Sequence, residues 1–175
     1  MGEPGSPTGV EPHPVVSVVV GDEQAEVVID ADRWGRLAGD VLRAEGRSGE
    51  LTVTFVDRLE IAALNAEHMG EPGPTDVLSF PLDADPTNSG PAVGPLLLGD
   101  VVICPAVAAQ AAPDHAGTLD DELALLTVHG VLHVLGHDHA DPGEAQVMRR
   151  RELELLEQLH WNGPAPAGFV QVQPS

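Results

Sequence analysis

The segment that decides the fold is residues 129–139, which read HGVLHVLGHDH. His129 and His133 are four residues apart, so on a helix their side chains lie one turn apart on the same face. Gly136 follows where a helix can end in a left-handed residue, and the turn can bring His139 back toward the first two histidines. Three converging imidazoles with no fourth protein ligand form the open arrangement of a catalytic zinc site. We therefore predict one zinc ion (Zn2+) per chain, bound by His129, His133 and His139.

Three further side chains, one imidazole and two carboxylates, are candidates for a catalytic role. His137 adjoins the turn. Its side chain either contacts one of the metal-binding imidazoles or is exposed to solvent. Asp138 either orients an imidazole, as carboxylates around zinc sites do, or caps the turn. Asp100 interrupts the apolar run 96–103, where a carboxylate needs either a hydrogen-bonding partner or a function. We keep His137, Asp138 and Asp100 as candidates and assign no catalytic residue among them.

The spacing of the histidines matches the H-x-x-x-H-x-x-G-x-x-H pattern of metzincin proteases, with one difference. Those enzymes carry a glutamate directly after the first histidine, where it acts as general base on the zinc-bound water. Here the position is occupied by Gly130, which cannot transfer a proton. We expect the glycine to leave open space beside the metal, which would suit a bulkier substrate.

Length and composition favour one cytoplasmic domain. The chain has 175 residues, enough for a single hydrophobic core, and its one cysteine, Cys104, excludes an internal disulfide and fits a reducing cytosol. No apolar run is long enough to span a membrane, and the run 15–20 is too short and lacks the basic flank of a signal peptide. We therefore expect a cytoplasmic protein with no membrane partner.

The charge of the chain is strongly negative. There are 28 acidic and eight basic residues, which give a formal net charge of −20, and all the basic residues are arginine. Such a surface repels nucleic acid, so an RNA substrate would have to be held locally, by the metal or by the arginines at 149–151. We expect these arginines instead to pair with Glu152, Glu154 and Glu157 on a solvated helix face.

Hydrophobic periodicity and capping residues predict an α+β fold. The predicted strands cover 15–20, 51–56, 77–81 and 96–103, and the predicted helices cover 31–45, 58–69, 105–112, 119–135 and 142–160. We expect a single domain at 15–160, with a mixed sheet of about four strands, about five helices and a zincin-like metal site on a buried helix. Residues 1–14 are predicted to be a disordered tail and residues 161–175 a flexible tail.

Three segments together resemble a known family. They are residues 74–81, which read PTDVLSFP, residues 98–104, which read LGDVVIC, and the histidine segment 129–139. In this order they resemble the signatures of the YbeY family of bacterial rRNA maturation factors, and the resemblance covers roughly residues 48–160.

The resemblance implies a zinc-dependent, single-strand-specific endoribonuclease that matures the 3′ end of small-subunit (16S) rRNA and takes part in ribosome quality control. It implies zinc ligands at His129, His133 and His139. The implied partners are single-stranded rRNA and the small ribosomal subunit, together with the Era GTPase and a small-subunit ribosomal protein. Members of the family often carry an arginine that supports catalysis just before the glycine that opens the proline-containing loop. This chain has Met69 at that position.

Two alternatives to a nuclease remain open on the sequence alone. A zinc metallopeptidase-like hydrolase is favoured by the histidine spacing and disfavoured by Gly130. A non-catalytic ribosome assembly factor with a structural zinc is favoured by Met69 and by the acidic surface. For a nuclease, the general base is also open, among a zinc-bound hydroxide, His137 and the 2′-hydroxyl of the RNA.

Overall fold

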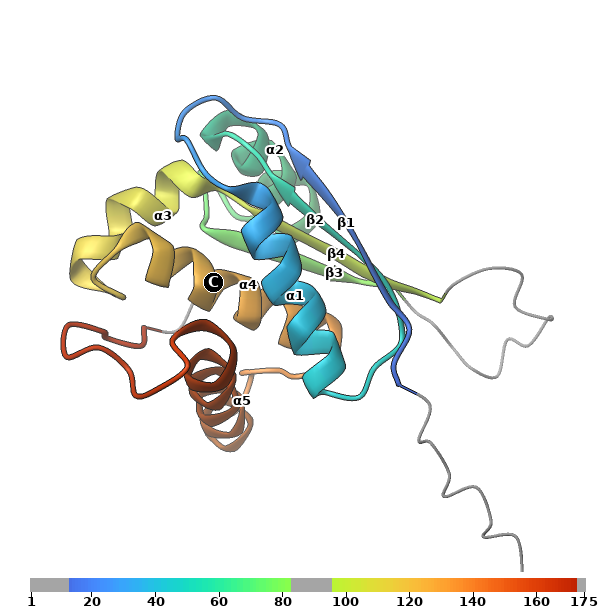
Figure 1. Cartoon of the computed structure of the whole chain (residues 1–175). Helices are drawn as coiled ribbons and strands as arrows, with labels where there is room; N and C mark the ends of the chain where they lie inside the picture. Colours follow the sequence, from blue (N-terminus) through green and yellow to red (C-terminus); the bar gives the residue numbers. More distant parts are fainter. Residues whose placement is uncertain (1–12, 83–95, 173–175) are drawn as a thin grey trace, which may run out of the picture.

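The computed structural model describes residues 13–82 and 96–172, and in these ranges the chain forms one mixed sheet flanked by helices (Figure 1). The strands are β1 (Val16–Asp22), β2 (Gly49–Phe55), β3 (Val77–Pro81) and β4 (Leu97–Ile103). Their order in the sheet is β1-β2-β4-β3, with β1, β2 and β4 parallel and β3 antiparallel to β4 at one edge. The strands are rich in β-branched and other apolar residues, as buried strands require.

Five α-helices accompany the sheet in the described part of the chain, as predicted. They are α1 (Ala31–Ala44), α2 (Arg58–Met69), α3 (Pro105–Ala111), α4 (Leu119–Val134) and α5 (Pro142–Leu155). Aspartate or threonine side chains cap four of them by accepting a hydrogen bond from the backbone N–H three residues on; these are Asp30, Asp57, Thr118 and Asp141. Such caps define where each helix begins.

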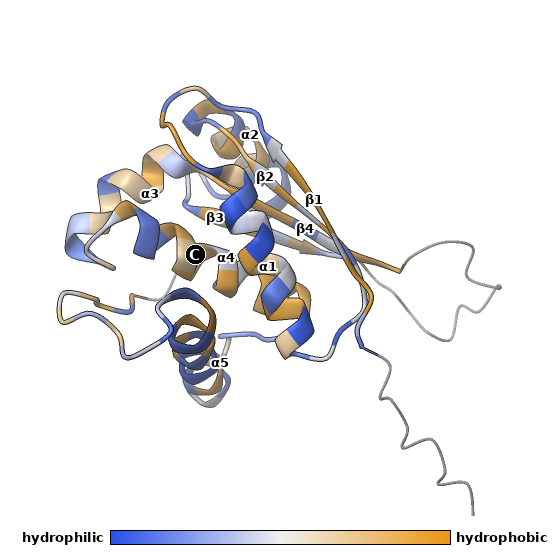
Figure 2. Ribbon diagram, in the orientation of Figure 1, coloured by the Kyte–Doolittle hydropathy of each residue, from blue (hydrophilic) through white to orange (hydrophobic). Residues whose placement is uncertain are grey.

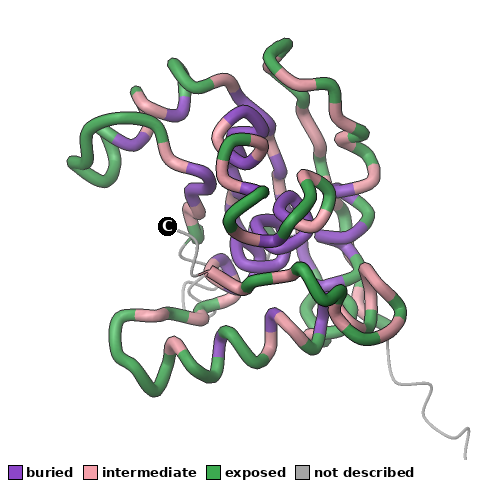
Figure 3. The backbone as a smooth tube through the Cα atoms, turned by 90° about the vertical axis from the view of Figure 1, so that its left-hand side faces the viewer, coloured by how far each residue is buried: buried purple, intermediate pink, exposed green. Residues whose placement is uncertain are grey.

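The helices lie in layers around the sheet. Helices α1 and α4 pack on one face in the larger apolar cluster, and α2 packs on the other face in a smaller cluster. Helix α5 packs on the side of α4 away from the sheet and is largely polar (Figure 2). Helix α4 is therefore enclosed between the sheet and α5, and burial is greatest at the centre of the molecule (Figure 3). The α+β fold with a mixed four-stranded sheet is confirmed.

The segment after α5 differs from the flexible tail that we expected at 161–175. A π-helical turn, Leu156–His160, extends α5, and Trp161 then donates a hydrogen bond from Nε1 to Oδ1 of Asp121 at 2.9 Å. The rings of Trp161 and Phe169 pack edge to face with centroids 4.8 Å apart, against the main core. These two aromatic side chains tie residues 161–169 to the domain.

The other predicted tail falls largely outside the described ranges, because of residues 1–14 the structure describes only 13 and 14. The polar, proline- and glycine-containing sequence of residues 83–95 also predicts a surface loop, and these residues lie outside the described ranges as well. Among the described residues, no helix combines the length and the apolar character that crossing a bilayer requires.

Candidate metal centre

Helix α4 positions two histidines, and its end turns the chain toward a third. Gly136 has a φ of 105°, and its N–H donates to the carbonyl of His133 at 3.0 Å. The N–H of His137 donates to the carbonyl of Leu132, also at 3.0 Å. These two bonds form a Schellman motif, which favours glycine at the residue with positive φ. The helix thus ends where the sequence predicted, and the chain reverses toward the face that carries His129.

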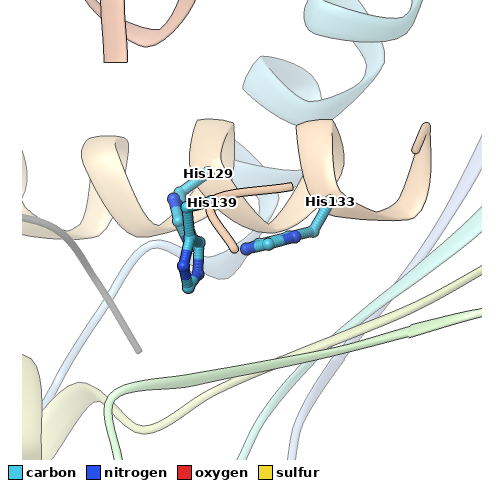
Figure 4. Close-up of side chains that lie close together, drawn as sticks. All are labelled: His129, His133 and His139. Atoms are coloured by element: carbon cyan, nitrogen blue, oxygen red, sulfur yellow. The ribbon is translucent and has the colours of Figure 1, made fainter. Parts of the chain in front are cut away.

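The three predicted ligands lie together. One ring nitrogen from each of His129, His133 and His139 lies within 4.8 Å of the others. The ring centroids of His129 and His133 are 4.5 Å apart, those of His133 and His139 are 4.8 Å apart, and those of His129 and His139 are 5.7 Å apart. The side chains converge below the end of α4 (Figure 4). This cluster of the three side chains is the imidazole triad.

The chemistry of the triad fits a metal ion. His129 is completely buried, its Nδ1 lies 3.3 Å from Oε2 of Glu152, and its Nε2 has no hydrogen-bond partner in the described ranges. A buried ring nitrogen without a partner is costly, but as a metal ligand it is satisfied. Imidazole suits zinc and other borderline transition metals, and three protein ligands leave a coordination position open.

The environment keeps His133 ready to bind a metal at neutral pH. Burial, reinforced by the nearby imidazoles of His129 and His139, lowers the pKa of His133 to about 4. A histidine must be neutral to donate its lone pair to a metal. His133 therefore needs no deprotonation before it binds a metal at pH 7.

A cleft of about 480 Å³ opens beside the triad. It lies between the end of α2, the loop that follows it, β3 and the turn after α4. The described residues that line it are both apolar and polar, with no lysine or arginine among them; they are Asn65, Met69, Glu71, Thr75, Val77, Leu78, Ser79, Pro81, His133, Asp138 and His139. The cleft can accommodate part of an extended polymer substrate, with the polar group that reacts placed beside the triad.

The structure separates the three catalytic candidates. Asp138 lines the cleft, and its Oδ1 accepts the backbone N–H of His139 at 2.7 Å. His137 is half-buried and belongs neither to the triad nor to the residues that line the cleft. Asp100 lies on the opposite face of the sheet, in a groove with Glu60 and Phe80 on the α2 side. Asp138 is thus the candidate that the fold brings to the metal centre.

The position of Asp100 follows from the fact that its strand is covered by helices on both faces of the sheet. On β4, Val101 points toward α4, so its neighbour Asp100 points toward α2. A strand that reads as one apolar run does not show which of its faces lies toward a given helix. The candidate Asp100 therefore faces away from the imidazole triad.

Gly130 has a structural role that differs from the one we expected. It is buried, and a Cβ built on it would stand 2.5 Å from Cγ1 of Val101. Its carbonyl accepts a hydrogen bond from the hydroxyl of Ser79 at 3.1 Å. The glycine therefore allows close packing of α4 on the sheet, and the space beside it is filled by Val101 rather than open to a substrate. The expectation of open space beside the metal was wrong.

We expect Gly130→Ala to lower the free energy of unfolding by about 1–3 kcal/mol, the usual cost of forcing extra atoms into a packed core. The higher helix propensity of alanine offsets up to about 1 kcal/mol of this loss. Urea denaturation of the metal-free protein measures the change. Val101→Ala removes the methyl groups that obstruct the new Cβ, so the double variant should lose less stability than the sum of the two single variants. Additive losses would mean that Val101 is not the obstacle.

Glu152 is the site residue that sequence reasoning missed. We expected it on a solvated face, paired with the arginines at 149–151, but it is completely buried against His129. Arg151 pairs instead with Glu45 and with Glu154, the latter at 3.0 Å. The signal was present, because Glu152 is four residues after Met148 and three before Leu155, which both lie on the buried side of α5.

The family model and the related proteins that match this chain all carry the same description. A family model described as Endoribonuclease YbeY matches residues 19–160. A protein called Endoribonuclease YbeY from Thermobifida fusca is 46% identical over 145 residues, which cover 81% of this chain and 92% of that protein. One of the same name from Mycolicibacterium vanbaalenii is 49% identical over 114 residues, 63% of this chain. That match spans 62% of the length of the mycolicibacterial relative.

A solved structure supports the fold. The solution structure of a Thermotoga maritima protein superposes with a TM-score of 0.53 at 21% sequence identity, covering 83% of this chain and 93% of that one. At this level of identity the likeness concerns the arrangement of helices and strands.

Proposed function

Because the chain belongs to the Endoribonuclease YbeY family, we propose that it is a zinc-dependent endoribonuclease that cleaves single-stranded RNA. The observation that carries the proposal is the imidazole triad at the end of a cleft, with no fourth protein ligand among the described residues. We further propose that the substrate is the 3′ end of small-subunit (16S) rRNA, in the cytoplasm. On this proposal the enzyme contributes to ribosome quality control, with the small ribosomal subunit, the Era GTPase and a small-subunit ribosomal protein as partners.

His129, His133 and His139 would hold the metal. When bound, zinc supplies a Lewis acid for a phosphate oxygen and lowers the pKa of a coordinated water to about 7. The chain's own contribution is to hold the ligands in place and to keep His133 neutral. Burial keeps His133 neutral, and the side chain of Asp138 accepts the backbone N–H of His139 and so restrains the segment that carries this ligand.

Asp138 is our candidate for proton transfer. Of the three candidates, Asp138 alone lines the cleft, where His133 and His139 of the triad also lie. One of its oxygens accepts the N–H of His139, and its other oxygen is available to a substrate in the cleft. A general acid or base must come within hydrogen-bond distance of the proton that it transfers, which the position of Asp138 allows.

The packing of Gly130 also bears on the peptidase alternative. A metzincin-type base would occupy this position, and here the position is both without a carboxylate and closed by Val101. The assembly-factor alternative draws on a different observation, that no lysine or arginine lines the cleft. An RNA phosphate in this cleft would meet fewer cations than nucleases usually offer.

We expect purified, metal-analysed protein to cut a labelled single-stranded RNA internally, to leave the same RNA intact as a duplex, and to leave casein intact. Cleavage should stop with a chelator and return with zinc. Gel analysis of the RNA and the casein on one preparation distinguishes the three functions. Casein cleavage would indicate a peptidase, and a zinc-loaded protein that cuts neither polymer would indicate an assembly factor with a structural metal.

A further inference from the structure

Glu152 is a buried carboxylate whose surroundings do not balance its charge. Its side chain is completely buried, Oε2 lies 3.3 Å from Nδ1 of His129, and Oε1 has no hydrogen-bond partner in residues 13–82 and 96–172. Burying a carboxylate is costly unless a cation and hydrogen bonds compensate it. Within those ranges, His129 is the one basic side chain found within 4 Å of the carboxylate of Glu152.

The arginines next to Glu152 along the chain do not supply the missing charge. Arg151 directs its guanidinium to Glu45 and Glu154, and Arg149 donates to the backbone carbonyl of Gln171 at 3.1 Å. The carboxylate of Glu152 therefore faces the imidazole of His129, whose opposite nitrogen, Nε2, points into the triad without a partner.

We infer that Glu152 is the positioning residue of the metal centre, which holds His129 through Nδ1 and supplies the negative charge that a bound dication requires. If Nδ1–H donates to Glu152, the lone pair of Nε2 is left free for the metal, so the carboxylate fixes both the tautomer and the orientation of the ring. A carboxylate hydrogen-bonded to a metal-binding imidazole also makes the imidazole a better ligand. The role rests on the proposed function in one respect, because it requires His129 to bind a metal, but it is independent of the substrate.

The position of Glu152 also connects α5 to the metal. Helix α5 starts after the turn that carries His139, and Glu152 lies three turns along it, between the buried side chains of Met148 and Leu155. The metal centre is therefore held by three consecutive elements, α4, the turn and α5. The three histidines come from α4 and from the segment that follows it, so α5 takes part in the metal centre only through Glu152.

The test measures zinc affinity by competition with a chelator of known affinity, on folded chains and without an RNA assay. Glu152→Gln keeps the size of the side chain and an acceptor for Nδ1–H but removes the charge. We expect zinc to bind about 10–100-fold more weakly, the usual effect of removing such a partner. In ¹⁵N-histidine spectra of the zinc-loaded wild type, we expect His129 to carry its proton on Nδ1.

The matched control is Glu122→Gln. Glu122 is also buried beside a histidine, with Oε1 3.2 Å from Nδ1 of His115, but neither residue belongs to the triad. Its substitution should leave zinc affinity unchanged, even where it lowers stability through the bond that Glu122 accepts from the backbone of Ala116.

The outcomes separate this role from the proposed function. Wild-type affinity in Glu152→Gln, or an equal loss in Glu122→Gln, would overturn the role of Glu152 and leave the metal centre standing. If the wild-type chain binds no zinc, both fail. Where Glu152→Gln does not fold, Glu152→Asp decides, because it keeps the charge but withdraws the carboxylate from His129: weaker zinc binding supports the role, and unchanged binding overturns it.

Discussion

Replacing His133 by alanine is expected to remove nearly all of the bound zinc and, with it, the cleavage of RNA. His133 supplies one of the three nitrogens that lie within 4.8 Å of one another, and two imidazoles do not hold zinc as three do. The loss of affinity should exceed the factor of about 10–100 that follows removal of a partner of a metal ligand. Elemental analysis after dialysis gives the zinc content, and a gel assay gives the cleavage rate.

His133 is a better test of the triad than His129. His129 is completely buried, so its removal would leave a cavity and an isolated Glu152, and a loss of zinc could follow from damage to the fold. His133 is half-buried and lines the cleft, where alanine leaves the core intact. For the zinc content, the matched control is His137→Ala, because it removes an imidazole from the turn that follows α4, outside the triad. A full zinc complement in His133→Ala would show that His133 is not a ligand.

The triad could be predicted from the sequence because every signal for it is local. Two histidines four residues apart must share a helix face, and a glycine three residues later marks where the helix can end. The structure has both features, including the positive φ of Gly136. The caps at Asp57 and Asp141 are local in the same sense, since each binds a backbone N–H three residues on.

The parts that the sequence did not predict depend on which distant segments meet. Nothing near Gly130 in the chain reveals that Val101 will press against it, and the burial of Glu152 follows from the docking of α5 on α4. The face of β4 on which Asp100 lies is likewise set by the helix that covers each side of the sheet. For such positions, the hydrophobic periodicity of one helix or strand can predict that a residue is buried. It does not predict which distant residue the side chain contacts, because that depends on how the elements pack.

Restoring an arginine at position 69 is expected to raise the single-turnover rate of RNA cleavage, by up to about 10²–10³, the amount that one group acting on transition-state charge typically contributes. Met69 is the last residue of α2, and it lines the same cleft as His133 and His139. Among the described residues that line the cleft there is no lysine or arginine, so no other cationic side chain duplicates the effect. Met69 is also partly exposed, so the longer side chain can be accommodated without repacking the core.

The charge must act from the cleft and not by making the whole protein less acidic. Leu59→Arg is the matched control, because it adds the same charge to the other end of α2, where the side chain is exposed and faces a different groove. Both variants change the net charge by one, so a gain through general attraction of RNA would appear in both and would fade with added salt. We expect the gain in Met69→Arg alone, with unchanged zinc content. Equal rates for wild type and Met69→Arg, in folded and zinc-loaded proteins, would mean that position 69 does not supply the missing charge, and that the resemblance to the family does not extend to this residue.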